Sequence, residues 1–536
     1  MIFSNSETRQ RSLAAVGIAV LALALFLTRF GYDYGISDQE EFVPAVVHMN
    51  DDAAFSTDWF VTTQAEQISV RTPTVFVLYV LTRLVSIETA LALLYTLSFT
   101  ALAISIFLLS MLFGANRLLS GAAVIVALVL TPQWTIGGND LAQSIVTPSM
   151  IAWSIGLAGF VAFLSGRRIM GAVALGIAAY FQPLVSLQLS GVLLISSLVS
   201  DWLSGTIDYR TLGRLAVAYL VYAVVAGPFI FLLATSHHQS VESTAIFETL
   251  AHLRAPHHYI FSSFPLRNIA LFILLLGSGF VFLVVTGSPY RYFGLAVLGT
   301  VLGLCLIGFV FTELIPSLLI LKLQLFKSSV IAKTVSIAAG AGWISHVRVL
   351  RFGHTVSSGA TNSRGNANRF ATLCAITGIT LIALQAFLTP RTLLPGRARV
   401  VDGMASLERW VQRETPTSSV FLIPPSNSRF RISTNRSIVI NFKAFPFQDD
   451  AILEWRKRME AIAGPIPRTG DTGERLGAMD AAYEALSPQA LIDLQHEYNV
   501  GYVVRKFPLD RTDQRFELSF VSHDGWRVYR INGVSA

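Results

Sequence analysis

Charged residues are scarce in this chain, and their scarcity excludes an ordinary soluble globular protein. Only 14% of the 536 residues are Asp, Glu, Lys or Arg, whereas a soluble domain carries about 25%. Hydrophobic residues make up 53% of the chain, and the mean hydropathy is +0.57. This composition predicts a polytopic α-helical membrane protein.

Several signatures of soluble enzymes are also missing. The two cysteines, Cys305 and Cys374, both lie inside apolar runs, which excludes a disulfide framework and a thiolate metal site. The sequence contains neither a Walker loop nor a Rossmann glycine fingerprint, and no Ser-His-Asp signature. An enzyme built from this chain must therefore take an activated donor that reaches it through the membrane. The formal charge of +7 is typical of cytoplasmic loops that face anionic lipid, so we predict no nucleic-acid partner.

Long apolar runs are what the chain has instead. Residues 13–30 form a run too long for the apolar core of a signal peptide, so they predict an uncleaved anchor. Residues 74–85 could form a span, but their length of about 12 residues favours a helix that lies in or re-enters the outer interface. With that segment left out, about eleven spans are predicted. The ten after the anchor are 89–112, 118–131, 149–165, 169–183, 185–200, 214–234, 267–286, 291–312, 329–346 and 370–388.

The arginines support this count. Under it, the loops on the inner side hold Arg117, Arg167-Arg168, Arg291 and the segment 348–369, which contains no Asp or Glu. Positive residues concentrate on the cytoplasmic side of membrane proteins. The N-terminus is therefore predicted to be cytoplasmic. The long polar loops and the C-terminal tail are predicted to lie outside, and we expect a bacterial inner membrane.

The character of the sequence changes near residue 390, where apolar runs give way to mixed helix and strand patterns. We therefore predict two domains, a membrane domain over 1–389 and a soluble extracytoplasmic α/β domain over 390–536. The predicted helices of the second domain are 402–414, 451–463 and 489–498, the last beginning at the helix-start signal Ser487-Pro488. Its predicted strands are 419–423, 437–442, 500–505, 516–522 and 526–531.

An acidic motif opens the first outer loop, residues 31–88. Asp38 and Glu40 are two positions apart and follow directly on the first apolar run. In an irregular segment both carboxylates can point at one divalent ion, or one can act as a base while the other orients it. A solvated loop that only connects two helices is the alternative. A further acidic residue, Asp140, lies beside Gly137-Gly138, which either let a ligand approach the backbone or simply make a turn.

Basic side chains mark the other outer segments. Arg254, His257 and His258 suit an anionic headgroup or phosphate, although interfacial histidines would show the same pattern. Lys327 sits where a lipid phosphate would lie, and snorkelling is the competing explanation. Lys443 stands in a mixed basic and aromatic stretch that suits a sugar or a phosphate, or an ordinary domain surface.

This arrangement resembles the GT-C superfamily of glycosyltransferases. The resemblance rests on the acidic motif after the first span, the short helix after Pro73 and the basic turn Phe113-Gly-Ala-Asn-Arg117. It implies an inverting enzyme that transfers a sugar from a polyprenyl-phosphate donor to a glycan, lipid or protein acceptor on the outer face. It also implies that Asp38 is a base or metal-orienting carboxylate with Glu40 beside it, and a divalent cation such as Mg²⁺ or Mn²⁺.

The same resemblance extends to the other candidate residues. It implies that Asp140 is a second acidic position and that Lys327 and Arg254 contact the donor phosphate. The chain departs from the family pattern in reading Asp-Gln-Glu rather than two adjacent acids, and in lacking a Trp-Trp-Asp sequence. Two alternatives stay open. One is a non-catalytic scaffold whose outer domain binds a partner, and the other is a lipid-linked saccharide transporter or flippase.

Overall fold

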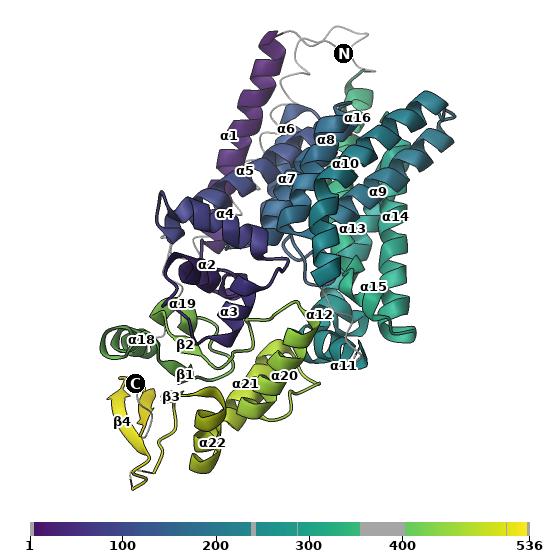
Figure 1. Cartoon of the computed structure of the whole chain (residues 1–536). Coiled ribbons are helices and arrows are strands. Elements are labelled where there is room, and N and C mark those ends of the chain that lie inside the picture. The colour runs from purple at the N-terminus through teal and green to yellow at the C-terminus, as the bar shows by residue number, and fades with distance from the viewer. Residues whose placement is uncertain (1–4, 237–242, 287, 354–401, 511, 533–536) are drawn as a thin grey trace. The chain divides into compact units, whose positions relative to one another are not determined.

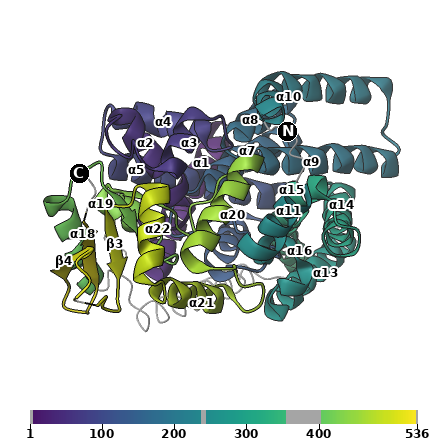
Figure 2. The same ribbon diagram turned by 60° about the horizontal axis from the view of Figure 1, so that its bottom comes forward.

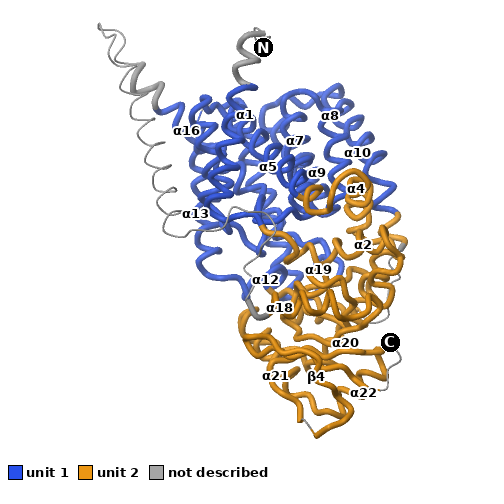
Figure 3. Tube along the Cα trace, turned by 90° about the vertical axis from the view of Figure 1, so that its left-hand side faces the viewer, with its two compact units in different colours: residues 1–32, 92–231, 257–394 blue, residues 33–91, 232–256, 395–536 orange. Residues whose placement is uncertain are grey.

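The computed structural model describes residues 5–236, 243–286, 288–353, 402–510 and 512–532, in two compact units (Figure 3). Unit 1 comprises residues 1–32, 92–231 and 257–394, and unit 2 comprises 33–91, 232–256 and 395–536. Unit 2 therefore joins two stretches of the predicted membrane domain to the C-terminal segment. The prediction from the sequence was a single boundary near residue 390, whereas the two compact units are each made of three separate stretches of the chain.

Unit 1 is helical, and helices α7 to α10 lie side by side within it (Figure 1). Two of its helices, α5 and α10, continue into unit 2. Its long helices, with the short π-helical segments η2 and η5 that continue α6 and α14, are α1 (Asn5–Phe30), α5 (Ile87–Leu112), α6 (Arg117–Ile125), η2 (Val126–Leu130), α7 (Pro148–Leu164), α8 (Arg168–Phe181), α9 (Pro183–Leu203), α10 (Tyr209–Ser236), α13 (Leu266–Val285), α14 (Arg291–Phe309), η5 (Val310–Leu314) and α16 (Ser329–Gly353). Its short elements are α12 (Pro256–Tyr259), η4 (Phe261–Ser263), α15 (Leu318–Lys322) and η6 (Leu325–Ser328).

Among the described residues, six helices are long and apolar enough to cross a membrane. They are Ser12–Phe30, Ile87–Leu112, Pro183–Leu203, Tyr209–Thr235, Leu266–Val285 and Arg291–Leu314. The predicted spans 149–165 and 169–183 correspond to α7 and α8, which are apolar but shorter. The predicted span 370–388 lies outside the described residues. The prediction of a multi-pass membrane protein is thus supported, while the count of about eleven spans stays a prediction.

Local sequence rules set many of the helix ends. The side chain of Thr147 accepts a hydrogen bond from the Met150 backbone N–H at 3.1 Å, and Pro148 takes the first helical position of α7. Helices α7 and α8 then pack closely through Gly159 and Gly171. A Cβ atom added at Gly159 would lie 2.8 Å from the Gly171 carbonyl oxygen. Because that contact is with backbone, it cannot be relieved by a side-chain rotation.

Unit 2 combines helices with a small mixed sheet. Its helical elements are η1 (Ser37–Glu41), α2 (Val43–Asn50), α3 (Trp59–Glu66), α4 (Thr72–Thr82), α11 (Ser243–Glu248), η3 (Thr249–Arg254), α18 (Asp402–Glu414), α19 (Phe430–Thr434), α20 (Asp449–Ala463), α21 (Thr472–Glu484) and α22 (Pro488–Tyr498). The strands are β1 (Val420–Leu422), β2 (Ser437–Ile438), β3 (Tyr502–Arg505), β4 (Phe516–Val521) and β5 (Arg527–Ile531). The strand order is β2-β1-β3-β5-β4, and β1 runs parallel to β2 and β3.

The sheet has a buried apolar core on the side covered by α18. Leu407 and Val411 of that amphipathic helix pack with Phe421, Tyr502 and Val528 of the strands. Figure 2 shows α18 on one side of β3 and α22 on the other. The predicted short helix near 74–85 and the predicted α/β character of the C-terminal segment are both confirmed.

Two details of unit 2 differ from the predictions. The strand expected over 437–442 ends at Ile438, because the side chain of Asn441 turns the chain by accepting a hydrogen bond from the Ala444 N–H at 2.8 Å. Helix α21 was not predicted, although the capping-box residues Asp471 and Glu474 indicate a helix start in the sequence.

The contact between α7 and α8 yields a stability prediction. Gly159→Ala should lower the thermal unfolding midpoint of the full chain in detergent, because its methyl group meets backbone, and overpacking costs about 1–3 kcal/mol. Gly191→Ala in α9 is the matched control, since an added Cβ there meets nothing within 4 Å. An unchanged or raised midpoint for Gly159→Ala would show that the close approach is not required.

Candidate functional site

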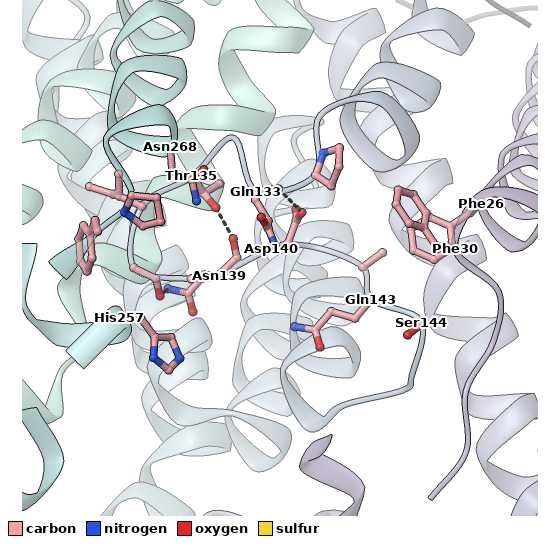
Figure 4. A pocket seen from close by; sticks show the side chains of 17 residues that line it. Phe26, Phe30, Gln133, Thr135, Asn139, Asp140, Gln143, Ser144, His257 and Asn268 are labelled. Carbon is pink, nitrogen blue, oxygen red and sulfur yellow. Dashed lines mark hydrogen bonds between the residues drawn. The ribbon is translucent and has the colours of Figure 1, made fainter. Parts of the chain in front are cut away.

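A cavity of about 490 Å³ opens within unit 1 beside the loop that follows η2 (Figure 4). Phe26 and Phe30 of α1 lie at one side of it, and His257 and Asn139 lie at the other. The polar side chains that line it include Asn139, Asp140, Gln143, Ser144, His257 and Asn268. The cavity therefore combines aromatic and hydrogen-bonding side chains, and two of the candidate residues from the sequence, Asp140 and His257, line it.

Asp140 holds its own loop in shape. Its Oδ2 accepts a hydrogen bond from the Gln133 N–H at 2.9 Å, and its Oδ1 accepts one from the Leu141 N–H at 2.8 Å. Its third partner is the Nζ of Lys333, 2.8 Å from Oδ1. With both oxygens engaged, this carboxylate acts as a clamp for the cavity wall in this structure.

Lys333 is a residue of this site that the sequence analysis did not single out. Its side chain is fully buried in α16, and its Nζ also donates to the Thr131 carbonyl oxygen at 2.6 Å. An ionisable residue inside an apolar helix is costly and calls for a partner, so the isolated Lys333 in the run 329–346 was the available signal. Lys333 and Asp140 together tie α16 to both ends of the loop between Thr131 and Asp140.

The glycines of this loop are required by close approach. Gly137 and Gly138 have positive φ values of 72° and 64°. A Cβ atom on Gly138 would lie 3.1 Å from the His258 ring, and the His258 Nδ1 lies 2.7 Å from the Gly137 carbonyl oxygen. His258 thus supports the loop, whereas His257 lines the cavity. Lys327, on η6, is buried, and its predicted contact with a donor phosphate stays a prediction.

The acidic motif lies in unit 2, where its carboxylates have different surroundings. Asp38 is partly exposed, and its Oδ1 lies 2.6 Å from the Nζ of Lys443. Glu40 is completely buried, and Glu41 forms a buried ion pair with Arg71. Of the three, only Asp38 is placed to meet a substrate in this arrangement.

A buried cluster around Arg431 holds the motif to the C-terminal segment. The Arg431 guanidinium donates to both oxygens of Asp58, at 2.8 and 3.2 Å, and both side chains are 0% exposed. Glu40 lies 3.7 Å from the Arg431 Nη1 and accepts a hydrogen bond from Asn441 at 3.3 Å. Asp58 also accepts from the Ile438 N–H at 2.9 Å and caps α3. Breaking such a buried pair costs about 3–5 kcal/mol.

Glu40 and Asp58 share the Arg431 cation, and both carboxylates are completely buried. Burial raises the pKa of Glu40 to about 8, because the charged carboxylate loses its water and Arg431 only partly compensates. A neutral Glu40 leaves Arg431 and Asp58 as a one-to-one ion pair. This environment favours a structural role for Glu40.

Arg254 lies close to Lys443 in unit 2. Its guanidinium stands 5.0 Å from the ring centre of Phe442 and 5.3 Å from that of Phe445. It also donates to the Lys443 carbonyl oxygen at 3.0 Å. The structure therefore brings Arg254, Lys443 and Asp38 into one neighbourhood of unit 2, while Asp140, His257, His258 and Lys327 belong to unit 1.

The Asp38 and Glu40 pair does not fit a divalent metal ion. Asp38 already faces Lys443, and Glu40 is buried beside Arg431, so each carboxylate has a basic partner. Across the described ranges, no group of three or more His, Cys, Asp or Glu residues is arranged to hold a metal ion. No step of the mechanism proposed below passes through a metal.

Comparison with known proteins leaves the function open. Residues 403–462 match a family described as a domain of unknown function, DUF6798. No curated protein matches the sequence. Among solved structures, the chain is similar to the crystal structure of ArnT from Cupriavidus metallidurans bound to undecaprenyl phosphate. The identity is 12% and the TM-score is 0.49, over 98% of this chain and 99% of that one. A likeness at that level leaves the function to be argued from the residues of this chain.

The raised pKa of Glu40 makes the stability of the protein depend on pH. Between about pH 4.5 and 8 the unfolded chain has released this proton while the folded chain keeps it, so stability falls as pH rises through that window. Glu40→Gln should remove this component, giving a thermal unfolding midpoint above that of the wild type at pH 9 and a flatter profile.

Asp58→Asn is the contrasting variant for that measurement. It leaves Arg431 without its main partner, so the midpoint should drop at every pH, in line with a loss of about 3–5 kcal/mol. If Glu40→Gln were as destabilising as Asp58→Asn at pH 9, Glu40 would be charged in the folded protein and the interpretation above would be wrong.

Lys333→Met should also destabilise the chain, because it leaves the Asp140 carboxylate without its cation, at a cost of about 3–5 kcal/mol for a buried pair. The double variant Lys333→Met with Asp140→Asn should recover part of the loss in unfolding midpoint. Equal midpoints for the wild type and Lys333→Met would mean that this ion pair does not hold the cavity loop.

Proposed function

We propose that this chain is a membrane glycosyltransferase of the GT-C type, which transfers a sugar from a polyprenyl-phosphate donor to an acceptor on the outer face with inversion. The observation that carries the proposal lies within unit 2, where the partly exposed Asp38 carboxylate stands beside Lys443, whose backbone carbonyl binds Arg254. A carboxylate that can act as a base and cations that suit a phosphate are the groups that transfer from a polyprenyl-phosphate sugar requires.

The cavity of unit 1 is a separate feature whose size and chemistry suit a polar ligand. Ligand sites in proteins typically measure about 300–1,000 Å³ and combine apolar walls with a few polar groups, and this cavity measures about 490 Å³. Asn139, Gln143 and Asn268 each offer both a donor and an acceptor, which suits sugar hydroxyl groups. The ion pair of Lys333 and Asp140 holds the loop that carries Asn139.

Asp38 is the proposed general base. The acceptor hydroxyl or amine attacks the anomeric carbon, and its proton passes to the Asp38 carboxylate. The bond between the anomeric carbon and the phosphate oxygen breaks, and its electron pair leaves with the polyprenyl phosphate. Asp38 suits this role because it is the partly exposed carboxylate of the motif, whereas Glu40 is buried.

The buried pair of Lys333 and Asp140 favours a second candidate, a transporter or flippase for lipid-linked saccharides. Such a protein needs ionisable residues inside its helices, and Lys333 is one. Asp38 distinguishes the two candidate functions, because a transporter has no chemical step in which this carboxylate would take part. A transporter would keep its activity in Asp38→Asn.

The test of the glycosyltransferase is the Asp38→Asn variant. It should keep its fold and bind polyprenyl phosphate at least as tightly as the wild type, but lose turnover by about 10²–10⁴-fold, the contribution of a general base. Turnover is measured as polyprenyl phosphate released from a panel of polyprenyl-phosphate sugars, with a cell-envelope extract as the acceptor source. Asp52→Asn, an exposed acid of the same loop, is the matched control. Full turnover in Asp38→Asn would refute the assignment.

A further inference from the structure

The backbone that carries Lys443 is firmly held. The Asn441 side chain accepts a hydrogen bond from the Ala444 N–H at 2.8 Å, and the Asn441 carbonyl oxygen accepts one from the Trp455 indole at 3.3 Å. Arg254 donates to the Lys443 carbonyl oxygen at 3.0 Å. These contacts come from three different parts of unit 2, so the turn over 441–444 is pre-formed.

The Lys443 side chain is more accessible than the turn that bears it. It is 28% exposed and reaches Asp38, which is 29% exposed, across 2.6 Å. This ion pair therefore borders on solvent. By contrast, Arg431 and Asp58 are both 0% exposed and pair through two hydrogen bonds. A partner can be exchanged where solvent reaches the pair, so the contact between Lys443 and Asp38 is the exchangeable one of the two.

We propose that Lys443 is a phosphate-binding residue that exchanges Asp38 for the oxyanion of a ligand. In the unliganded protein its ammonium group neutralises Asp38. When a phosphate arrives, Lys443 binds the phosphate oxygen and Asp38 loses this partner. The exchange breaks and forms only hydrogen bonds and ion pairs, and no covalent bond changes.

The surroundings of Lys443 favour an anion. The Arg254 guanidinium, which is bound to the same turn, adds a second positive charge to this neighbourhood. An ammonium group binds phosphate as a mobile point charge, which suits a group that changes partners. The phosphate chemistry is common to inorganic phosphate and to a lipid-linked phosphate.

This inference deepens the proposed function and rests on it for the identity of the phosphate. In the proposed glycosyltransferase, the exchange would link donor binding to catalysis, because the arriving donor phosphate takes Lys443 away from the proposed base, Asp38. It would also give the segment 403–462, which matches the family of unknown function, a part in the reaction. That segment supplies Arg431, Asn441 and Lys443, which contact the acidic motif and Asp58.

The experiment measures binding of inorganic phosphate to the full chain in uncharged detergent, by ³¹P NMR titration at constant ionic strength. Lys443→Met should weaken binding by about tenfold or more, the value of a hydrogen bond to a charged group. Asp38→Asn should tighten binding by about two- to fivefold, because it removes a competitor worth no more than an exposed ion pair. Lys443→Arg should keep most of the affinity.

The opposite directions of the two changes make the result decisive, since general damage to the fold would weaken binding in both variants. The ion pair of Lys457 and Glu497 is the matched control. It spans 2.9 Å, and its side chains are 62% and 45% exposed. Lys457→Met and Glu497→Gln should each leave phosphate binding unchanged. Weaker binding in Asp38→Asn, unchanged binding in Lys443→Met, or no saturable binding in either wild type or Asp38→Asn would overturn the exchange.

A parallel titration with polyprenyl phosphate in the same detergent separates this inference from the proposed function. If Lys443→Met weakens and Asp38→Asn tightens the binding of both ligands, and polyprenyl phosphate binds more tightly than inorganic phosphate, the site takes a lipid-linked phosphate. If only the binding of inorganic phosphate changes in this way, the exchange is supported, the site takes free phosphate, and the proposed donor is wrong. If polyprenyl phosphate binds equally to wild type and Lys443→Met, Lys443 is not its ligand and the proposed role in donor binding falls.

Discussion

The buried ion pair between Arg431 and Asp58 is the interaction on which unit 2 depends. The two residues are 373 positions apart in the sequence, yet they form two hydrogen bonds in a place that water does not reach. Removing one partner would leave an uncompensated charge in a medium of low dielectric constant, which is far more costly than losing a surface pair. This contact therefore fastens residues 33–91 to the C-terminal sheet and fixes where the acidic motif lies.

The two carboxylates of the acidic motif have different surroundings. Glu40 and Asp38 are two residues apart, but burial raises the pKa of Glu40 while Asp38 stays at the surface beside Lys443. Glu40 is thereby buried in the loop, and Asp38 is the carboxylate that we propose as the general base. The difference between the two residues is one of solvent access. A carboxylate that accepts a proton from a substrate must be reachable by that substrate, and Glu40 is not.

Unit 1 uses a comparable device in a different setting. Lys333 is buried in a helix and binds both the Thr131 carbonyl and the Asp140 carboxylate, so the cavity loop is held at its two ends by one cation. The polar residues that remain on the cavity wall, such as Asn139 and Gln143, are neutral. In each unit a buried cation therefore binds a carboxylate of a neighbouring segment and fixes a loop.

The sequence alone determined the local features of this protein. The apolar runs located α5 and α13 to within two residues, and Ser487-Pro488 marked the start of α22, because run length and capping depend only on neighbouring residues. It also singled out Asp38, Asp140, His257 and Lys443 as candidates. Only the tertiary structure decided that Lys333 clamps Asp140, that Glu40 is buried and that residues 33–91 join the C-terminal sheet. Those outcomes depend on contacts between segments that are distant in the sequence. Only such contacts bury a side chain, and burial decides its accessibility and shifts its pKa.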